Sequence, residues 1–436
     1  MNAPTDTLAG RRLAYLSQLG ADAALLFGSH HHLRNGDAEY RYRPCSDLYY
    51  LTGWEDPEVA ALFRPGTDLP FVLFVQPKDP AREVWTGVRA GVQGARERFG
   101  ADAAFPWSEL SSRLPELLQG FATLHYRFGE DPDRDRTVFG AMQAPSRAAA
   151  RNGLEVPHRL VDARRLLAQM RLVKSADELQ RLRVAADITV DAHIAAMKLG
   201  RPGVFEYEVE ALIDGSFRRR GGTGPGYTTI VGGGKNACIL HYVTNNEVLR
   251  PGDLCLVDAG CEFGYYTADV TRTWPVSGTF SGPQRDVYEV VLRAELAAID
   301  AARVGTPYKR MHDVAVRVLT EGMVDLGLLE GDVPELIATE AYRRYYMHGT
   351  GHWLGLDVHD AGAYWEGLRS RPLAADMVCT VEPGIYVAPD DERAPEAFRG
   401  IGVRIEDDIR ITEGAPEVLT ERCPKAIDDV EAICRA

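Results

Sequence analysis

Two aspartates, Asp258 and Asp269, stand in apolar, β-branched runs on either side of a glycine-containing turn. Such a pattern predicts two antiparallel strands joined as a hairpin. If Phe263 and Gly264 form the turn, Asp258 lies directly opposite Asp269, with Cβ atoms roughly 5 Å apart. Facing carboxylates repel each other at that distance, so either one of them holds a proton or a cation lies between them. The hairpin therefore predicts a proton-sharing pair or a cation site.

A second group of candidate residues lies in the glycine-rich segment 346–360, which contains three histidines, His348, His352 and His359. The glycines between the first two disfavour a helix, and the HExxH glutamate of a zincin is missing. Glycine-rich backbone instead permits close approach to a ligand and lets each imidazole point independently. A single histidine would more often be a satisfied core residue, whereas three histidines here favour a functional site.

Further carboxylates occur in strand-like segments. Glu382 ends one strand, and Arg404 and Glu406 share one face of another because side chains alternate along a strand. With the hairpin aspartates and one histidine they make a set of four carboxylates and one imidazole: Asp258, Asp269, His352, Glu382 and Glu406. Oxygen-rich ligation with one nitrogen suits Mn²⁺, Co²⁺ or Zn²⁺.

Four negative charges balance two dications, so this set predicts a dinuclear metal centre. Two metal ions roughly 3.5–4 Å apart share a bridging hydroxide and polarise a carbonyl group for attack. The chemistry that these residue types predict is hydrolysis.

The length of 436 residues predicts two domains that position these side chains. Ser175 and Glu178 form a capping box at the start of a helix, which places the boundary near this point. We therefore expect domains at 1–172 and 173–436. Alternating strand and helix patterns in the first are typical of an α/β domain with a mixed sheet flanked by helices. The second has the pattern of an α+β domain, with helices packed on an antiparallel sheet.

The expected elements follow from hydrophobic periodicity and turn residues. In the first domain we expect strands at 23–27, 47–51, 60–63, 71–75 and 122–127. In the second domain we expect helices at about 175–199, 205–219, 283–303 and 308–326. Strands of the second domain are expected at 227–231, 237–242, 254–258, 266–274, 377–382 and 402–411.

Charge and composition exclude several classes of function. The net charge of −14 argues against nucleic acid as a partner. Residues 1–172 contain 21 basic and 21 acidic residues, so the second domain carries the whole net charge, as a carboxylate-lined site would. No run of about 18 apolar residues exists, which predicts that no segment spans a membrane. The lack of a signal-peptide pattern and seven scattered cysteines predict a cytoplasmic protein with reduced thiols.

Almost the whole chain resembles the aminopeptidase P (Xaa-Pro aminopeptidase) family of pita-bread metallopeptidases. The motifs that carry the resemblance are Ile239-Leu-His241-Tyr, Val257-Asp258-Ala-Gly, Asp269-Val-Thr-Arg-Thr, Met347-His-Gly-Thr-Gly-His352, Val381-Glu382-Pro-Gly-Ile-Tyr386 and Gly402-Val-Arg404-Ile-Glu406. Two more, Arg34-Asn-Gly-Asp37 and Val84-Trp85-Thr-Gly, lie in the first domain. The resemblance implies a creatinase-type N-terminal domain followed by a pita-bread catalytic domain, in which helices cover an antiparallel sheet.

The resemblance also implies a role for each site residue. Two divalent metal ions, typically Mn²⁺ with Zn²⁺ or Co²⁺ as alternatives, are held by Asp258, Asp269, His352, Glu382 and Glu406. The implied catalytic residues are Glu382, which also handles the proton of the nucleophilic water, His348 and His359, which stabilise the tetrahedral intermediate, and Arg404. The implied substrate-binding residues are His241, Tyr386, Arg371, Trp85 and Asp37. In the family the last two reach a neighbouring subunit's site, so a homo-oligomer, either a dimer or a tetramer, is expected.

The implied activity is release of the N-terminal residue from peptides whose second residue is proline. The scissile imide nitrogen has no N–H, so it needs a proton as it leaves, and a nearby acid supplies it. Prolidase, a dipeptidase relative, has the same five ligands, but Met347-His348 and His352-Trp353 look more like aminopeptidase P. The other alternative is a pita-bread protein that has lost catalysis and serves as a binding module, although none of the five ligands is missing here.

Overall fold

The computed structural model describes residues 5–144, 151 and 153–436 of the chain. The chain packs into two compact units, residues 1–170 and 171–436, and each unit has its own hydrophobic core. Within the described residues, no helix combines the length and the apolar character that are needed to cross a membrane.

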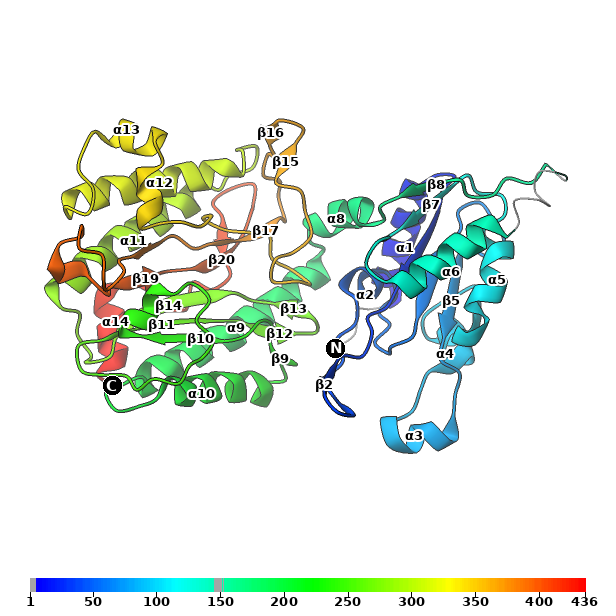
Figure 1. Cartoon of the computed structure of the whole chain (residues 1–436), viewed down its shortest axis with the longest axis horizontal. Helices are drawn as coiled ribbons and strands as arrows, with labels where there is room; N and C mark the ends of the chain where they lie inside the picture. The colour runs from blue at the N-terminus through cyan, green and yellow to red at the C-terminus, as the bar shows by residue number, and fades with distance from the viewer. Residues whose placement is uncertain (1–4, 145–150, 152) are drawn as a thin grey trace. The chain divides into compact units, whose positions relative to one another are not determined.

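The first unit is built on a six-stranded mixed sheet with the order β6-β5-β4-β1-β7-β8. Three of its strands, β5, β7 and β8, are labelled in Figure 1. Its strands are β1 (Ala23–Phe27), β4 (Ala60–Phe63), β5 (Phe71–Val75), β6 (Ala103–Pro106), β7 (Thr123–Tyr126) and β8 (Arg159–Val161). β1 runs parallel to β7 and antiparallel to β4. The expected strands at 23–27, 60–63 and 71–75 are confirmed.

Helices cover both faces of this sheet. α5 (Leu110–Leu117) and α6 (Pro132–Gln143) pack on one face. On the other face lies α1 (Thr5–Leu19), whose Tyr15 contacts Phe63 edge to face at 5.1 Å between ring centroids. Because both faces are buried, the strands are unbroken apolar runs. Other elements of this part of the chain are β2 (Leu33–Asn35), β3 (Ala38–Glu39), α3 (Pro80–Thr86), α4 (Gly91–Glu97) and α8 (Arg164–Leu172).

The strand expected at 47–51 is wrong, because these residues form helix α2 (Ser46–Thr52). Six of its 7 residues are buried, so the sequence shows a continuous apolar run instead of a helical period. Aromatic residues such as Tyr49 also favour a strand when they are judged locally. The helix ends at Gly53, which has φ 66° and donates its N–H to the Tyr49 carbonyl oxygen. Burial on nearly all sides therefore overrides the local pattern.

The second unit contains the helices expected from the sequence. The four long ones are α9 (Ala176–Leu199), α10 (Glu206–Arg219), α11 (Gly282–Ala301) and α12 (Lys309–Asp325), and they are followed by α13 (Val333–Ala338) and α14 (Ile427–Cys434). The capping box at the start of α9 is also present, since the Ser175 N–H donates to Glu178 Oε2 at 2.9 Å.

Antiparallel sheets lie between these helices (Figure 1). α9 and α10 pack against the sheet β10-β11-β14, while α11 and α12 pack against β17-β20-β21 and the pair β18-β19. The strands are β10 (Ile230–Gly233), β11 (Leu254–Ala259), β14 (Val270–Pro275), β17 (Val378–Val381), β18 (Gly384–Tyr386), β19 (Gly402–Arg404), β20 (Asp407–Arg410) and β21 (Glu417–Val418). The expected α+β arrangement is confirmed.

The strand expected at 237–242 is wrong. Residues Gly234–Cys238 form a 3₁₀ helix, η2, and the chain then turns. The fully buried Glu206 accepts hydrogen bonds from the Gly233 N–H at 2.8 Å and the Asn236 side-chain amide at 3.0 Å. The chain therefore folds around a buried carboxylate here and does not extend, although its residue types favour a strand.

The hairpin at 254–275 has a different turn from the expected one. Phe263 pairs with Tyr266 across the strands β12 (Cys261–Phe263) and β13 (Tyr266–Thr267). The turn residues are therefore Gly264 and Tyr265, with φ of 57° and 68°. Positive φ at both central residues is what a type I′ turn requires. A tyrosine in this conformation is unusual, so the sequence pointed to the preceding pair of residues.

This turn changes the register of the two hairpin aspartates. Asp258 pairs with Thr271, and not with Asp269 as expected. The aspartates are instead diagonal neighbours on one face of the sheet, a relation that separates residues by about 7–8 Å. Their separation leaves more room between them than directly opposed carboxylates would have.

Helices α11 and α12 pack closely where Gly322 of α12 meets Val290 of α11. A Cβ atom at position 322 would lie 2.3 Å from Cγ1 of Val290. We predict that Gly322→Ala lowers the free energy of unfolding by about 1–3 kcal/mol, the usual effect of overpacking a core. Urea titration followed by circular dichroism measures this change.

The matched control is Gly215→Ala in α10, where an added Cβ atom meets nothing within 4 Å. This substitution should raise the free energy of unfolding by about 0.5–1 kcal/mol, because alanine favours a helix over glycine. A stabilising effect of Gly322→Ala would contradict the packing argument.

Candidate active site

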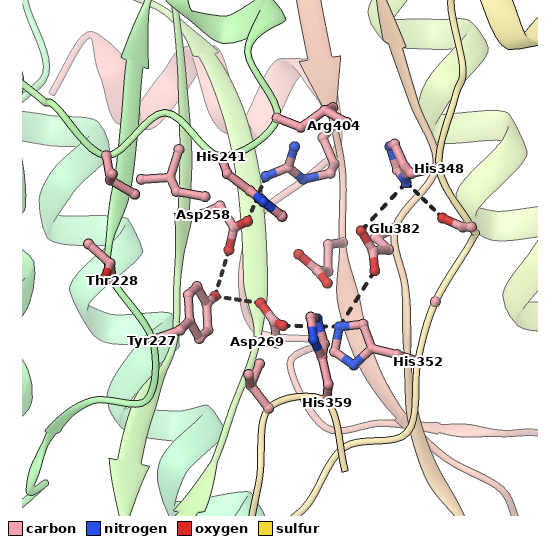
Figure 2. Close-up of a pocket in the computed structure, with 17 residues that line it drawn as sticks. Tyr227, Thr228, His241, Asp258, Asp269, His348, His352, His359, Glu382 and Arg404 are labelled. Atoms are coloured by element: carbon pink, nitrogen blue, oxygen red, sulfur yellow. Dashed lines mark hydrogen bonds and ion pairs between the residues drawn. The ribbon is translucent and has the colours of Figure 1, made fainter. Parts of the chain in front are cut away.

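Residues from distant parts of the sequence line one cavity of about 470 Å³ in the second unit. Nine of the residues selected from the sequence line it: Asp258, Asp269, His352, Glu382, Glu406, His348, His359, His241 and Arg404. Figure 2 shows carboxylates and imidazoles that point toward a common space. Apolar side chains contribute another part of the lining, namely Ile230, Leu240, Val243 and Val358.

Alternation along β11 turns Asp258 into the cavity. Cys255 and Val257 belong to the core that α9 and α10 cover. Leu256 and Asp258 therefore face the opposite side of the sheet, where Leu256 packs in a small apolar cluster with Ile230. The strand thus presents apolar residues to the helices and a carboxylate to the cavity.

The histidine segment runs beside β17, which places His352 next to Glu382. The His352 N–H donates to Thr380 Oγ1 at 3.1 Å, and its carbonyl oxygen accepts the Thr380 N–H at 2.9 Å. The Glu382 N–H donates to the Thr350 carbonyl oxygen at 2.8 Å. Only glycine fits at position 351, since a Cβ atom there would lie 2.0 Å from the Thr380 carbonyl oxygen.

Tyr227 links the two hairpin aspartates, and sequence reasoning missed it. Its hydroxyl group donates to Asp258 Oδ1 at 2.6 Å and also contacts Asp269 Oδ1 (Figure 2). Burial raises the pKa of Tyr227 well above its usual value, and the two carboxylate charges add to the effect. The hydroxyl group therefore stays protonated. Tyr227 reaches this position because the adjoining strand pairs Ile230 with Asp258, a pairing that a single sequence does not reveal.

Arg404 is a buried cation among the carboxylates. Its Nη2 donates to Asp258 Oδ2 at 2.6 Å, and its Nε donates to Thr271 Oγ1 at 3.0 Å. The Thr271 hydroxyl group in turn donates to Glu406 Oε2 at 2.6 Å. Arg404 therefore fixes one carboxylate directly and a second one through a threonine.

Tyr386 connects Arg404 with His348 behind the cavity lining. Its hydroxyl oxygen accepts from Arg404 Nη1 at 3.2 Å and lies 2.9 Å from His348 Nε2. His348 Nδ1 lies 2.7 Å from the Gly349 carbonyl oxygen, which can only accept, so Nδ1 carries the proton. Burial lowers the pKa of His348 to about 4, and the charge of Arg404 acts in the same direction. The imidazole is therefore neutral near pH 7.

The donor atoms fit divalent metal ions. Asp269, His352 and Glu406 each offer a ligand atom within 4.8 Å of the others, and His352 Nε2 lies 3.6 Å from Glu382 Oε1. Carboxylate oxygens with one imidazole nitrogen suit Mn²⁺, Co²⁺ or Zn²⁺. Four carboxylates in one cavity also require more positive charge than the single guanidinium of Arg404 supplies.

In the metal-free protein these groups hold protons more tightly than usual. Burial raises the pKa of Glu382 to about 7, against the charges of His352 and Arg404. Burial and neighbouring carboxylates raise the pKa of Glu406 well above its usual value. Burial alone would lower the pKa of His352, but its contact with Asp269 at 3.4 Å raises the pKa to about 9. Protons thus supply positive charge that a bound cation would otherwise provide.

Besides Tyr386, three residues selected from the sequence do not line this cavity. Arg371 Nε donates to the Ala363 carbonyl oxygen at 2.7 Å, and its Nη1 pairs with Glu366 at 3.1 Å. Asp37 lies in the turn between β2 and β3, and Trp85 lies in α3 with 88% of its surface exposed. These two belong to the first unit. The roles of all three residues stay predictions.

Both units of the chain match models of known protein families. The family model described as metallopeptidase family M24 matches residues 180–413, and the model of the aminopeptidase P N-terminal domain matches residues 8–125. The Xaa-Pro aminopeptidase of Escherichia coli (strain K12) is 44% identical over 426 residues, which cover 97% of this chain and 96% of that protein.

Solved structures agree with these matches. The aminopeptidase PepP of Pseudomonas aeruginosa has a TM-score of 0.97 and 45% identity, over 100% of this chain and 98% of that chain. The Zn-substituted aminopeptidase P of E. coli in complex with product has a TM-score of 0.95 and 42% identity, over 100% of this chain and 99% of that chain. The chain therefore belongs to the aminopeptidase P family, the Xaa-Pro aminopeptidases within metallopeptidase family M24.

Proposed function

We propose that the chain is a metal-dependent aminopeptidase that releases the N-terminal residue from peptides with proline in the second position. The observation that carries the proposal is the convergence of four carboxylates and one imidazole on a single cavity. A relative named Xaa-Pro aminopeptidase is 44% identical over nearly the whole chain, which supports the same activity. The apolar part of the cavity lining suits the pyrrolidine ring of proline.

The residues that would hold two divalent metal ions are Asp258, Asp269, His352, Glu382 and Glu406. We propose Mn²⁺ as the occupant, with Zn²⁺ or Co²⁺ as alternatives. When bound, such ions lower the pKa of water and polarise the carbonyl group of the scissile bond.

The chain's own side chains would handle the protons and the developing charge. Glu382 lies within 3.8 Å of His348 and can take the proton of the attacking water and return it to the proline nitrogen. His359 lines the cavity, and its ring contacts His352 edge to face at 4.3 Å between centroids. Burial lowers the pKa of His359, and the neighbouring His352 charge adds to this effect. A neutral His359 can donate an N–H to the oxyanion of the tetrahedral intermediate.

The remaining roles rest on the family resemblance. We propose that Arg371 and His241 orient the substrate, and that Trp85 and Asp37 contribute to the site of a neighbouring subunit in a homodimer or homotetramer. We also propose that the domains divide at 172/173 and that the protein acts in the cytoplasm.

The proposed activity predicts which peptides are cleaved. With added Mn²⁺, the protein should release the first residue from Xaa-Pro-Yaa peptides and leave peptides without a second-position proline intact. Mass spectrometry of the products, repeated with Co²⁺ and Zn²⁺, makes the measurement. Activity confined to Xaa-Pro dipeptides would indicate prolidase instead. A protein that cleaves no peptide and retains under one metal equivalent per chain would support the binding-module alternative.

The metal-holding role of Asp258 can be tested separately. Asp258→Ala should reduce hydrolysis roughly 1000-fold or more, because metal binding supplies several kcal/mol of transition-state stabilisation. Circular dichroism should show a folded chain, and elemental analysis should show lost metal. Turnover comparable with that of the unmodified protein would contradict the proposed metal centre.

The raised pKa values predict how pH affects the metal-free protein. Because the pKa of folded Glu382 is raised to about 7, its stabilising contribution is complete below about pH 4.3 and is lost as the pH rises through 7. The raised pKa of His352 acts in the same sense up to about pH 9. Below about pH 6.5 the lowered pKa values of His348 and His359 act in the opposite sense. We therefore predict that the melting temperature after EDTA treatment falls as the pH rises from about 6.5 to about 9.

Added Mn²⁺ should restore the melting temperature, with the largest gain at the upper end of this pH range, because metal ions bind deprotonated ligands. Asp258→Ala serves as the control and should gain little from Mn²⁺. A metal-free protein whose stability rises over this range would contradict the assigned pKa shifts.

A further inference from the structure

A second set of buried charges lies beside the cavity and has no part in the proposed chemistry. It consists of Arg171, Lys174 and Asp360, with the half-exposed Asp357 at its edge, and is here called the Asp360 cluster. The side chains of Lys174 and Asp360 are each 1% exposed, and that of Arg171 is 4% exposed. Burying charged groups is unfavourable unless each one is paired and hydrogen-bonded. A buried ion cluster often adds no net stability over apolar side chains of the same size. We therefore ask whether this cluster serves the nearby cavity.

The contacts within the cluster converge on one carboxylate. Lys174 Nζ donates to Asp360 Oδ2 at 2.9 Å, and Arg171 Nη2 donates to Asp360 Oδ1 at 2.5 Å. Arg171 Nη2 also donates to Asp357 Oδ2 at 2.7 Å. Burial would raise the pKa of Asp360, but the charges of Lys174 and Arg171 outweigh burial and hold the pKa below its usual value. Asp360 is therefore ionised at neutral pH and is held from two sides.

The cluster fixes a loop that has no regular secondary structure, residues 354–360. Backbone contacts alone hold this loop at few points, such as the Asp360 N–H that donates to the Trp353 carbonyl oxygen at 2.8 Å. A Cβ atom at Gly355 would lie 2.3 Å from Asp360 Oδ2. The absence of a side chain at position 355 thus makes the space that the Asp360 carboxylate occupies.

The cations come from a segment that is itself anchored next to β17. The Lys174 N–H donates to the Asp376 carbonyl oxygen at 2.9 Å, and Val173 forms a β-bridge with Met377. β17 begins one residue later and leads to Glu382. The cluster therefore joins the loop that carries His359 to the strand that leads to Glu382.

We propose that Asp360 is a positioning residue, which Lys174 and Arg171 hold in place so that the adjacent His359 imidazole stays directed into the cavity. This inference rests on the proposed function, because His359 matters only if it acts on a substrate there. Asp360 itself does not line the cavity, whereas Val358 and His359 on the same loop do. Its action is thus exerted through the backbone of a neighbouring residue.

The test compares Asp360→Asn with Asp391→Asn in the full-length, Mn²⁺-loaded protein. Asp391 is 12% exposed and accepts hydrogen bonds from Arg344, including one at 3.0 Å from Nε, in a loop that does not line the cavity. The control thus removes the same charge from a comparable ion pair. Asp360→Asn should lower kcat for Ala-Pro-Ala roughly 10- to 100-fold, the effect of a misplaced group. KM should change less than about threefold, and kcat of the control less than about twofold.

Two further readouts separate positioning from a merely structural role. Elemental analysis should show unchanged metal content in Asp360→Asn. In the Zn²⁺-loaded proteins, which lack the paramagnetic broadening that Mn²⁺ causes, the ¹⁵N signals of the His359 ring should broaden or divide, with His359→Gln used for assignment. The double variant Lys174→Met, Asp360→Asn removes both charges of the Lys174–Asp360 pair and leaves Arg171 paired with Asp357. It should regain melting temperature without regaining kcat. If kcat recovers together with the melting temperature, or stays normal in Asp360→Asn, the inference is overturned.

The test also covers a variant that does not fold and an unmodified protein that shows no activity. If Asp360→Asn does not fold, Asp357→Asn weakens the same cluster from its more exposed side and should lower kcat about threefold at an unchanged melting temperature. An unchanged kcat in that variant counts against the inference. If the unmodified protein cleaves no Xaa-Pro peptide, the proposed function fails, whereas the His359 ring signals still report whether Asp360 fixes the loop.

Discussion

Mutual repulsion among buried carboxylates is the constraint on which the rest of the catalytic unit depends. Asp258, Asp269, Glu382 and Glu406 share one cavity in which burial raises the free energy of each charged form. The fold keeps them together through rigid neighbours: Arg404 donates to one carboxylate, and Thr271 donates to another. Such preorganisation costs stability in the empty protein and becomes favourable when cations bind. The surrounding sheets therefore keep four mutually repelling carboxylates close together, and this arrangement favours the binding of cations.

The sheets can hold the carboxylates together because one face of each packs against helices while the other face carries the cavity residues. In β11, Cys255 and Val257 pack beneath α9 and α10, while Asp258 on the opposite face lines the cavity. The side chains facing helices are mostly apolar, although the buried Arg272 of β14 shares the face of Val270 and Trp274 and pairs with Asp407. The energy that holds these strands in place therefore comes largely from groups outside the cavity. Hydrophobic burial on one face thus offsets charge repulsion on the other.

The sequence predicts much of this molecule because many local signals agree. The long helices of the second unit follow from their apolar period and caps. The grouping of the five proposed metal ligands in one cavity follows from residue types together with the family motifs. The errors have two physical causes. At 47–51 and 237–242, tertiary burial and a buried Glu206 override local strand preference. The turn at Gly264 and Tyr265 depends on a rare tyrosine conformation. The contact of Tyr227 with both aspartates depends on a strand pairing that cannot be read from a single sequence.

The paired strands β11 and β14 also limit how the connecting segment between them can change in length. A slip of one residue in the register exchanges the two faces of a strand. An insertion of one residue that shifted β14 against β11 would turn Thr271 toward the helices and Trp274, now in the core, toward the carboxylates. An insertion of two residues keeps every side chain on its own face. Length variants of this hairpin that retain the cavity therefore place the extra residues in the turn, outside the paired segments, or shift the register by an even number of residues.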